Sequence, residues 1–246
     1  MSILVSEVKK KKEFSQLPDS LIDKALSLSK NNFKETRALL RKYFGVFLTN
    51  KVLKIKDEEI LKRHVSSKKR DYMEFYEKIF EGNKNFREVL DIGCGVNGFS
   101  YVSLKENTGE IKYVGLEAVG QIVEKSNEFF KKRGFVKARV FHLDIFDLGS
   151  VEKFVKEAEI PKAIFLFQII DALEAFERDF SKKLLLMIKK YLRKDDLLVV
   201  TMPTKSLSGK KKFEVKREWL RYFLNENFEV EEFFIGEERV FRCRNN

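Results

Sequence analysis

The sequence predicts an α/β fold in which a basic, helical N-terminal domain precedes a mostly parallel, seven-stranded sheet. Two observations carry this prediction. From about residue 88 onward, short and nearly continuous apolar runs alternate with segments of helical periodicity, a pattern typical of parallel strands buried on both faces. Before residue 88 the apolar residues follow helical spacing only, and the chain carries most of its excess positive charge there.

The N-terminal part is expected to form a small helical bundle with a basic outer face. Pro18 and the polar pair that follows it open a helical run that reaches Leu28, and Asn31-Asn32 interrupts the pattern. A second helix is expected from Phe33 to a C-terminal Gly45, and a third, short one over 57–63.

A further helix is expected to begin at Ser66 or Ser67, either of which can cap it, and to end at Gly82. The sheet domain follows. Its expected parallel strands are 88–92, 111–116, 138–142, 163–169 and 197–202, and its expected helices are 98–105, 119–133, 151–158, 174–192 and 214–227. Two final strands, 228–234 and 238–243, are close enough in sequence to be antiparallel neighbours.

The charge distribution favours a polyanionic partner. The chain has 49 Lys and Arg against 38 Asp and Glu, a formal net charge of +11. Residues 1–70 hold 18 basic and 8 acidic residues, and a second basic cluster occupies 205–217. Two basic regions on an otherwise balanced chain are typical of nucleic-acid binding, although a lysine-rich solvated surface gives the same composition.

Several protein classes are excluded by composition. The longest nearly continuous apolar run, 163–170, is far shorter than the ~18 residues of a membrane span, and the start of the chain lacks the order of a secretory signal. Two cysteines and two histidines argue against a disulfide framework and a zinc site. We therefore expect a cytoplasmic, metal-free protein with no membrane association. We also expect a monomer, which the composition itself does not determine.

A glycine-rich turn connects the first expected strand to the next helix. Gly93, Gly95 and Gly98 have the G-x-G-x-x-G spacing, which lets a ligand approach the backbone closely. Glu117 ends the second strand, where a carboxylate can accept ribose hydroxyls, and Asp144 follows the third, where it can accept the adenine amino group. The spacing alone fits a nicotinamide dinucleotide, an adenosine cofactor or a turn without a ligand.

Asp91, two residues before the first glycine, helps to distinguish between these possible ligands. The segment 89–95 resembles the first motif of class I methyltransferases that use S-adenosylmethionine (SAM), and the terminal antiparallel hairpin also suits that fold. The resemblance favours SAM over a nicotinamide cofactor.

Three segments resemble the Arm/Rmt group, the aminoglycoside-resistance 16S ribosomal RNA methyltransferases. The segment 64–70, H-V-S-S-K-K-R, is similar to the group's H-x-S-T-x-E-R. The segment 91–97, D-I-G-C-G-V-N, is similar to D-(I/L)-(A/G)-C-G-(L/V)-N, and 202–209, M-P-T-K-S-L-S-G, to F-P-T-(R/K)-S-L-G-G. The basic helical start also resembles that group's RNA-binding domain, so the resemblance spans essentially the whole chain.

This resemblance implies methyl transfer from SAM to N7 of a guanine in helix 44, at the decoding site of the assembled small ribosomal subunit. It implies an RNA-binding domain over 1–63 and a methyltransferase domain over 64–246. The cofactor residues that it implies are Ser67, Arg70, Asp91, Gly93, Cys94, Gly95, Glu117, Asp144, Ile145 and Gln168. Of these, Arg70 would bind the methionine carboxylate of SAM. Gln168, Glu174 and Lys205 would position the target base, and Lys34, Arg37, Arg41, Lys205, Lys210, Lys211 and Lys212 would contact RNA.

The chain departs from the family pattern at three positions. Lys69 replaces a Glu, Ser67 replaces a Thr, and Gln168 stands where members of the group commonly have Lys. The change at 168 removes a positive charge near the target base. It leaves cofactor binding credible but leaves the exact guanine, and any link to drug resistance, open.

The residues fit methylation of guanine N7 better than methylation at other atoms. N7 carries a free lone pair, so the enzyme needs alignment and exclusion of water rather than a general base, and the base must be flipped out to be reached. The residues after the fourth strand, Phe167 to Asp171, do not form the motif of exocyclic-amine methyltransferases. Two alternatives remain: a methyltransferase of the same fold that acts on another RNA site, and a non-catalytic RNA-binding ribosome-assembly factor.

Overall fold

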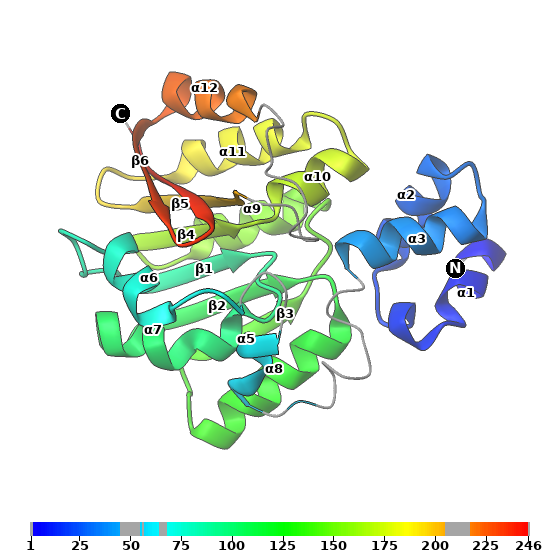
Figure 1. Cartoon of the computed structure of the whole chain (residues 1–246), viewed down its shortest axis with the longest axis horizontal. Coiled ribbons are helices and arrows are strands. Elements are labelled where there is room, and N and C mark those ends of the chain that lie inside the picture. Colours follow the sequence, from blue (N-terminus) through cyan, green and yellow to red (C-terminus); the bar gives the residue numbers. More distant parts are fainter. Residues whose placement is uncertain (1, 45–54, 56, 64–67, 205–216, 246) are drawn as a thin grey trace.

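The sheet has the predicted class. The computed structural model describes residues 2–44, 55, 57–63, 68–204 and 217–245. They include a seven-stranded sheet of order β3-β2-β1-β4-β5-β7-β6, in which β7 is antiparallel to both of its neighbours and the other pairs are parallel (Figure 1). The strands are β1 (Glu88–Ile92), β2 (Lys112–Glu117), β3 (Ala138–His142), β4 (Lys162–Phe167), β5 (Leu197–Pro203), β6 (Glu229–Ile235) and β7 (Glu238–Arg244).

The continuous apolar runs explain why the central strands lie where they do. Every residue of β1 is buried, as are all residues of β5 except Pro203, whereas the edge strand β6 alternates between exposed and half-buried positions. The strand order reverses between β1 and β4, so the crevice that open α/β sheets use for ligands lies outside the carboxyl ends of these two strands.

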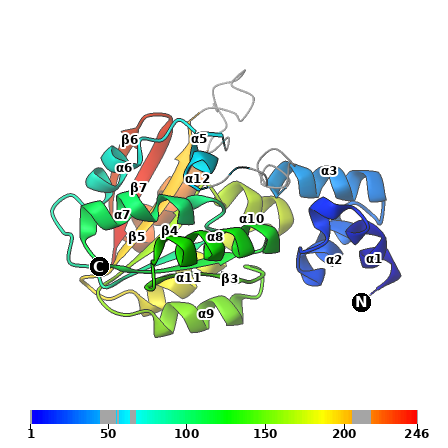
Figure 2. The same cartoon turned by 90° about the horizontal axis from the view of Figure 1, so that it is seen from below.

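Helices cover both faces of the sheet and divide the core into two clusters (Figure 2). One face is covered by α6 (Tyr72–Ile79), the 3₁₀ helix η3 (Asn97–Ser100), α7 (Tyr101–Thr108) and α8 (Gly120–Arg133). The other is covered by α9 (Leu148–Glu157), α10 (Ile170–Phe176), α11 (Phe180–Tyr191) and α12 (Glu218–Asn227). Within the described residues, no helix is long and apolar enough to cross a membrane.

Residues 2–44 form a separate helical lobe, here called the N-terminal lobe. It contains α1 (Ile3–Lys9), the 3₁₀ helix η1 (Lys12–Phe14), α2 (Asp19–Leu28) and α3 (Phe33–Tyr43). Figure 1 shows the lobe beside the edge of the sheet domain at which β1 ends. The backbone oxygen of Gln16 accepts from the N–H of Gly120 at 3.3 Å, and the hydroxyl of Ser20 donates to Asp144, so the lobe touches residues that follow β2 and β3.

The short helix α5 (Glu59–Arg63) confirms the third expected helix, and the segment that leads into it is held by the sheet domain. Asp57 pairs with Lys132, and Glu58 pairs with Arg133 at 2.7 Å, both at the end of α8. Part of the segment before residue 64 therefore packs on α8 rather than on the N-terminal lobe.

Two expectations for helices were wrong, and one helix was missed. The helix expected from Ser66 or Ser67 begins at Tyr72, because the side chain of Asp71 accepts from the two N–H groups that follow and caps it. The single helix expected over 174–192 is two helices, because Asp179 adopts a left-handed conformation with φ of 61° between them. Helix α1 was not expected at all.

Candidate functional site

The glycine loop, residues 93–98, leaves the carboxyl end of β1 and turns into η3. Gly93 and Gly95 have φ values of +72° and +50°, which disfavour any residue with a side chain. A Cβ atom at position 93 would lie 2.0 Å from Cδ1 of Ile169 and 3.2 Å from Cδ1 of Ile145. The left-handed conformation therefore favours glycine at 93, the side chain of Ile169 fills the space beside it, and the structure brings the predicted residue Ile145 to the loop.

The carboxylate of Glu117 fixes the glycine loop to the end of β2. One of its oxygens accepts from the backbone N–H of Gly95 and the other from that of Val119, each at 2.8 Å. Burial raises the pKa of this carboxyl, and the backbone donors act in the opposite direction. Each oxygen keeps a further lone pair, so the predicted ribose contact is chemically compatible with these bonds.

Asp91 lies fully buried behind the same loop. Its Oδ2 accepts from Nδ2 of Asn97 at 2.7 Å and from the hydroxyl of Tyr113 at 2.8 Å, while its Oδ1 has no hydrogen-bond partner. Burial raises the pKa of this carboxyl to about 6, against the opposing effect of the two hydrogen bonds. A buried carboxylate oxygen without a partner is costly unless a ligand supplies a donor.

Arg70 joins this group from the segment before α6. Its Nε and Nη2 form a bidentate pair with Glu238 of β7, at 2.8 and 2.7 Å, and both side chains are less than a tenth exposed. Its Nη1 makes longer bonds, 3.4 Å to Oδ1 of Asn97 and 3.3 Å to the hydroxyl of Tyr72. Asn97 thus connects two predicted cofactor residues, Arg70 and Asp91, through one buried polar network.

Two other predicted cofactor residues have different surroundings. Asp144 accepts from the backbone N–H of Phe146 at 3.0 Å and from Ser20 of the N-terminal lobe. The sulfur of Cys94 packs on the backbone of β2, since a Cβ atom at Gly115 would lie 2.8 Å from it. Burial raises the pKa of this thiol well above its ordinary value, so Cys94 is a protonated packing residue.

Two of the three residues predicted to position the target base are described, and they lie in different parts of the fold. Gln168 directly follows β4, at the crevice edge, with a left-handed φ of 55° and its backbone N–H bonded to the oxygen of Thr201 at 3.0 Å. The carboxylate of Glu174 instead accepts from the N–H groups of Asp179 and Ser181, at 2.8 and 3.0 Å, at the start of α11. Lys205 lies outside the described residues.

The predicted RNA-binding residues are only partly described. Lys34 is exposed on α3, whereas Arg37 donates to the backbone oxygen of Glu7 at 2.8 Å and Arg41 pairs with Glu13 at 2.7 Å. The two arginines therefore also hold α3 to the rest of the lobe. Ser67 and the lysines at 210, 211 and 212 fall outside the described residues.

Sequence reasoning missed two pairs beside the site. Glu238 was not singled out, because its pairing with Arg70 spans 168 residues and no local motif signals it. Arg217 was assigned to a basic cluster, but it pairs with Asp171 of α10 and donates to the backbone oxygen of Pro203 at 3.2 Å. It therefore ties the residue before α12 to the end of β5 and the start of α10.

Comparisons with known proteins give the fold. No family model and no curated protein sequence matches the chain. The structure of the 16S rRNA methylase RmtB matches at a TM-score of 0.74 and 18% identity, over 99% of this chain and 97% of the other. The structure of an rRNA methylase from Escherichia coli matches at a TM-score of 0.76 and 18% identity, over 99% of this chain and 98% of the other. The structure of the 16S rRNA methylase ArmA matches at a TM-score of 0.57 and 21% identity, over 85% of this chain and 97% of the other.

These structures confirm the class I methyltransferase fold, and they agree with the resemblance that the three sequence segments carry. For the first two, the likeness extends over the N-terminal lobe as well as the sheet domain, because it covers 99% of this chain.

Proposed function

We propose that this protein is a SAM-dependent methyltransferase that modifies guanine N7 in helix 44 of the small-subunit ribosomal RNA, within the assembled subunit. The single observation that carries the proposal is the buried network of Arg70, Asn97 and Asp91 behind the glycine loop. The likeness to 16S rRNA methylases over nearly the whole chain supports the choice of RNA as substrate. The substrate would place the protein in the cytoplasm, with the N-terminal domain binding RNA.

The residues at the loop fit the cofactor. The unpartnered Oδ1 of Asp91 can accept from the α-ammonium group of SAM. Nη1 of Arg70, whose present bonds are the longest that its guanidinium makes, can donate to the α-carboxylate while Glu238 keeps the other edge in place. The left-handed backbone of Gly93 and Gly95 turns the loop at the carboxyl end of β1, where the cofactor would bind, and Glu117 has lone pairs for the ribose.

SAM, when bound, supplies an electrophilic methyl group. Guanine N7 carries a free lone pair and needs no deprotonation before it attacks the methyl group. We therefore infer that the protein contributes by orienting the two reactants and by excluding water from the site. Ile145 and Ile169 place apolar side chains beside Gly93 and would help to keep water from a cofactor bound there. Gln168 stands at the carboxyl end of β4, where a neutral amide can hydrogen-bond a flipped base. Glu174 serves as a positioning residue, because it fixes the start of α11.

The test is methyl transfer from labelled SAM to purified small ribosomal subunits, beside naked ribosomal RNA, with the product probed by chemical cleavage at N7-methylguanine. The proposal expects labelled subunits and one cleavage site in helix 44. Labelled RNA without cleavage at N7-methylguanine would support methyltransferase activity but contradict N7 as the methylated atom. SAM binding without label would favour the non-catalytic assembly factor.

A further inference from the structure

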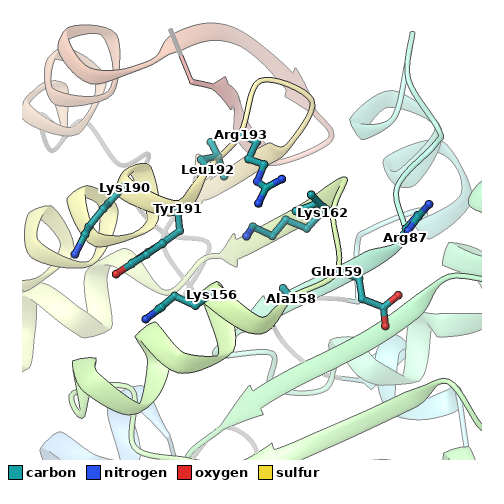
Figure 3. Close-up of a pocket in the computed structure, with 10 residues that line it drawn as sticks. Arg87, Lys156, Ala158, Glu159, Lys162, Lys190, Tyr191, Leu192 and Arg193 are labelled. Carbon is teal, nitrogen blue, oxygen red and sulfur yellow. The ribbon is translucent and has the colours of Figure 1, made fainter.

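A cavity of about 530 Å³ opens at the end of the sheet opposite to the glycine loop (Figure 3). Arg87, which precedes β1, and Lys162, which begins β4, both line it. Because β1 has five residues at ~3.3 Å each, its two ends are about 17 Å apart. The cavity is therefore separate from the site proposed for methyl transfer, and the inference below does not depend on that proposal.

Positive charge dominates this cavity, here called the basic cavity. Five cationic side chains line it, those of Arg87, Lys156, Lys162, Lys190 and Arg193, against the single carboxylate of Glu159. Glu159 also pairs with a lysine outside the lining, Lys112, at 3.2 Å. Such a concentration of one charge in a concave surface destabilises the fold and raises the local concentration of anions.

The cations at the mouth of the basic cavity are largely uncompensated. Of the five, Lys190 has a carboxylate at 3.6 Å, that of Glu152. Arg87, Lys156 and Arg193 are exposed, and none of them forms an ion pair with a residue that the structure describes. Their donors are free to bind a ligand.

Lys162 places a buried cation in the lining. Its side chain is 3% exposed, and its Nζ donates to the backbone oxygen of Val155 at 2.8 Å. Its nearest carboxylate, Asp196, is 4.0 Å away and accepts from the backbone N–H groups of Lys162 and Arg193, each at 2.8 Å. Burial lowers the pKa of Lys162 and the neighbouring Arg193 acts in the same direction, while the carboxylates of Asp196 and Glu88 act in the opposite direction. Figure 3 shows these two side chains converging from β4 and from the end of α11.

Tyr191 holds two of the lysines in place. The Nζ atoms of Lys156 and Lys190 lie 5.7 and 5.0 Å from the centre of its ring, within the range of cation–π attraction, and its hydroxyl donates to Glu152. The lysines therefore lose less conformational freedom when an anion binds.

We propose that the basic cavity binds a phosphate group. A phosphate offers several strong acceptor oxygens, which match the fork of Arg193 and the ammonium group of Lys162, the two side chains that converge in Figure 3. Lys156 adds positive charge to the same cavity. The phosphate can come from an RNA strand or from a small phosphorylated molecule, and both present the same chemistry to the cavity.

Titration calorimetry with inorganic pyrophosphate, at constant ionic strength, tests the site. Wild-type protein should bind one equivalent saturably. Arg193→Glu and Lys156→Glu should each weaken this affinity at least tenfold. Both positions are exposed, so the variants should fold, and circular dichroism checks this. The matched control is Lys153→Glu, an exposed position on the same helix that does not line the cavity, which should change the affinity less than twofold.

A competition experiment then identifies the source of the phosphate. A single-stranded RNA oligonucleotide that displaces pyrophosphate from wild-type protein would support the site and assign it to RNA. RNA that binds without displacing pyrophosphate would support the site and assign it to a small ligand. The absence of saturable pyrophosphate binding by wild-type protein would overturn the proposal, as would an equal loss of affinity in Lys153→Glu, because diffuse surface charge would then explain the binding.

Discussion

The pKa of Asp91 gives the sharpest test of the buried network. The structure raises this pKa to about 6, whereas an unfolded aspartate titrates near 3.8. The folded protein therefore holds a proton on Asp91 more tightly than the unfolded chain does. The penalty for burying the ionised form is absent below pH 3.8, grows as the pH rises from there to 6, and is fully present above 6, where it amounts to about 3 kcal/mol.

Asp91→Asn removes this titration and keeps the shape of the side chain. Between pH 7 and pH 4.5, wild-type protein should gain about 2 kcal/mol of unfolding free energy relative to the variant. Carboxylates with a lowered pKa, such as Glu177 and Asp179, lose stability on acidification in both proteins, so their effect cancels in the comparison.

Urea unfolding followed by the fluorescence of Trp219 at the two pH values provides the measurement. The readout is the change in unfolding free energy between the two pH values, not the absolute stability of the variant. The amide introduced by Asp91→Asn would place a buried N–H donor without a partner, which lowers the stability of the variant at both pH values. If wild-type protein and Asp91→Asn show the same dependence on pH, then Asp91 is not the buried, half-satisfied carboxylate described above.

Three further substitutions test the surroundings of the site. Glu117→Ala should lower the free energy of unfolding by about 3 kcal/mol in urea unfolding, because two buried N–H groups lose their acceptor, and should weaken SAM binding in calorimetry. Glu238→Ala should cost 3–5 kcal/mol, on the order measured for buried pairs that lose one partner, because Arg70 stays buried and charged. Gly120→Ala should cost about 1–3 kcal/mol and reduce methylation of ribosomal subunits, because the new Cβ would lie 2.8 Å from Cβ of Gln16 and displace the N-terminal lobe.

Two of these substitutions have a control variant. Glu238→Gln keeps a neutral acceptor for Arg70 and should cost less than Glu238→Ala; equal losses would show that the neutral acceptor contributes nothing and that the negative charge of Glu238 is what Arg70 requires. Gly149→Ala adds a Cβ whose nearest neighbour is Oδ1 of Asp147 at 3.7 Å, so its stability should stay within 0.5 kcal/mol or rise. A Gly120→Ala protein as stable and active as wild type would contradict the tight docking of the lobe. Unchanged SAM affinity in Glu117→Ala would argue against its role at the ribose.

The sheet could be predicted from the sequence because its signal is local. Each central strand is a short apolar run between polar turns, and β3 was expected with the bounds that the structure gives, Ala138–His142. The break between α10 and α11 could not be predicted in this way, because the apolar spacing continues through it. The carboxylate of Glu174 closes that turn by accepting from two N–H groups beyond it.

The residues of the candidate site also differ in whether a local sequence signal predicts them. The glycine loop, Asp91 and Glu117 were found because each follows or ends a strand that the pattern predicts. The partner of Arg70 was missed because Glu238 lies on the terminal hairpin, and only the order of the sheet brings β7 beside β5 and within reach of the segment before α6. Long-range pairing of this kind leaves no periodic trace in a single sequence.

The contacts of the N-terminal lobe also bear on how RNA binding and cofactor binding can be connected. The lobe does not rest on an arbitrary surface, since Ser20 bonds to Asp144 and Gln16 packs on Gly120, the residues that follow β3 and β2. In an α/β sheet these are the positions at which a ligand meets the carboxyl edge. Any movement of the lobe relative to the sheet domain therefore changes the hydrogen bonding of Asp144 directly, and a ligand that uses this carboxylate competes with Ser20. Under the proposed function, the two binding events share a residue, so each can alter the affinity of the other by the same factor.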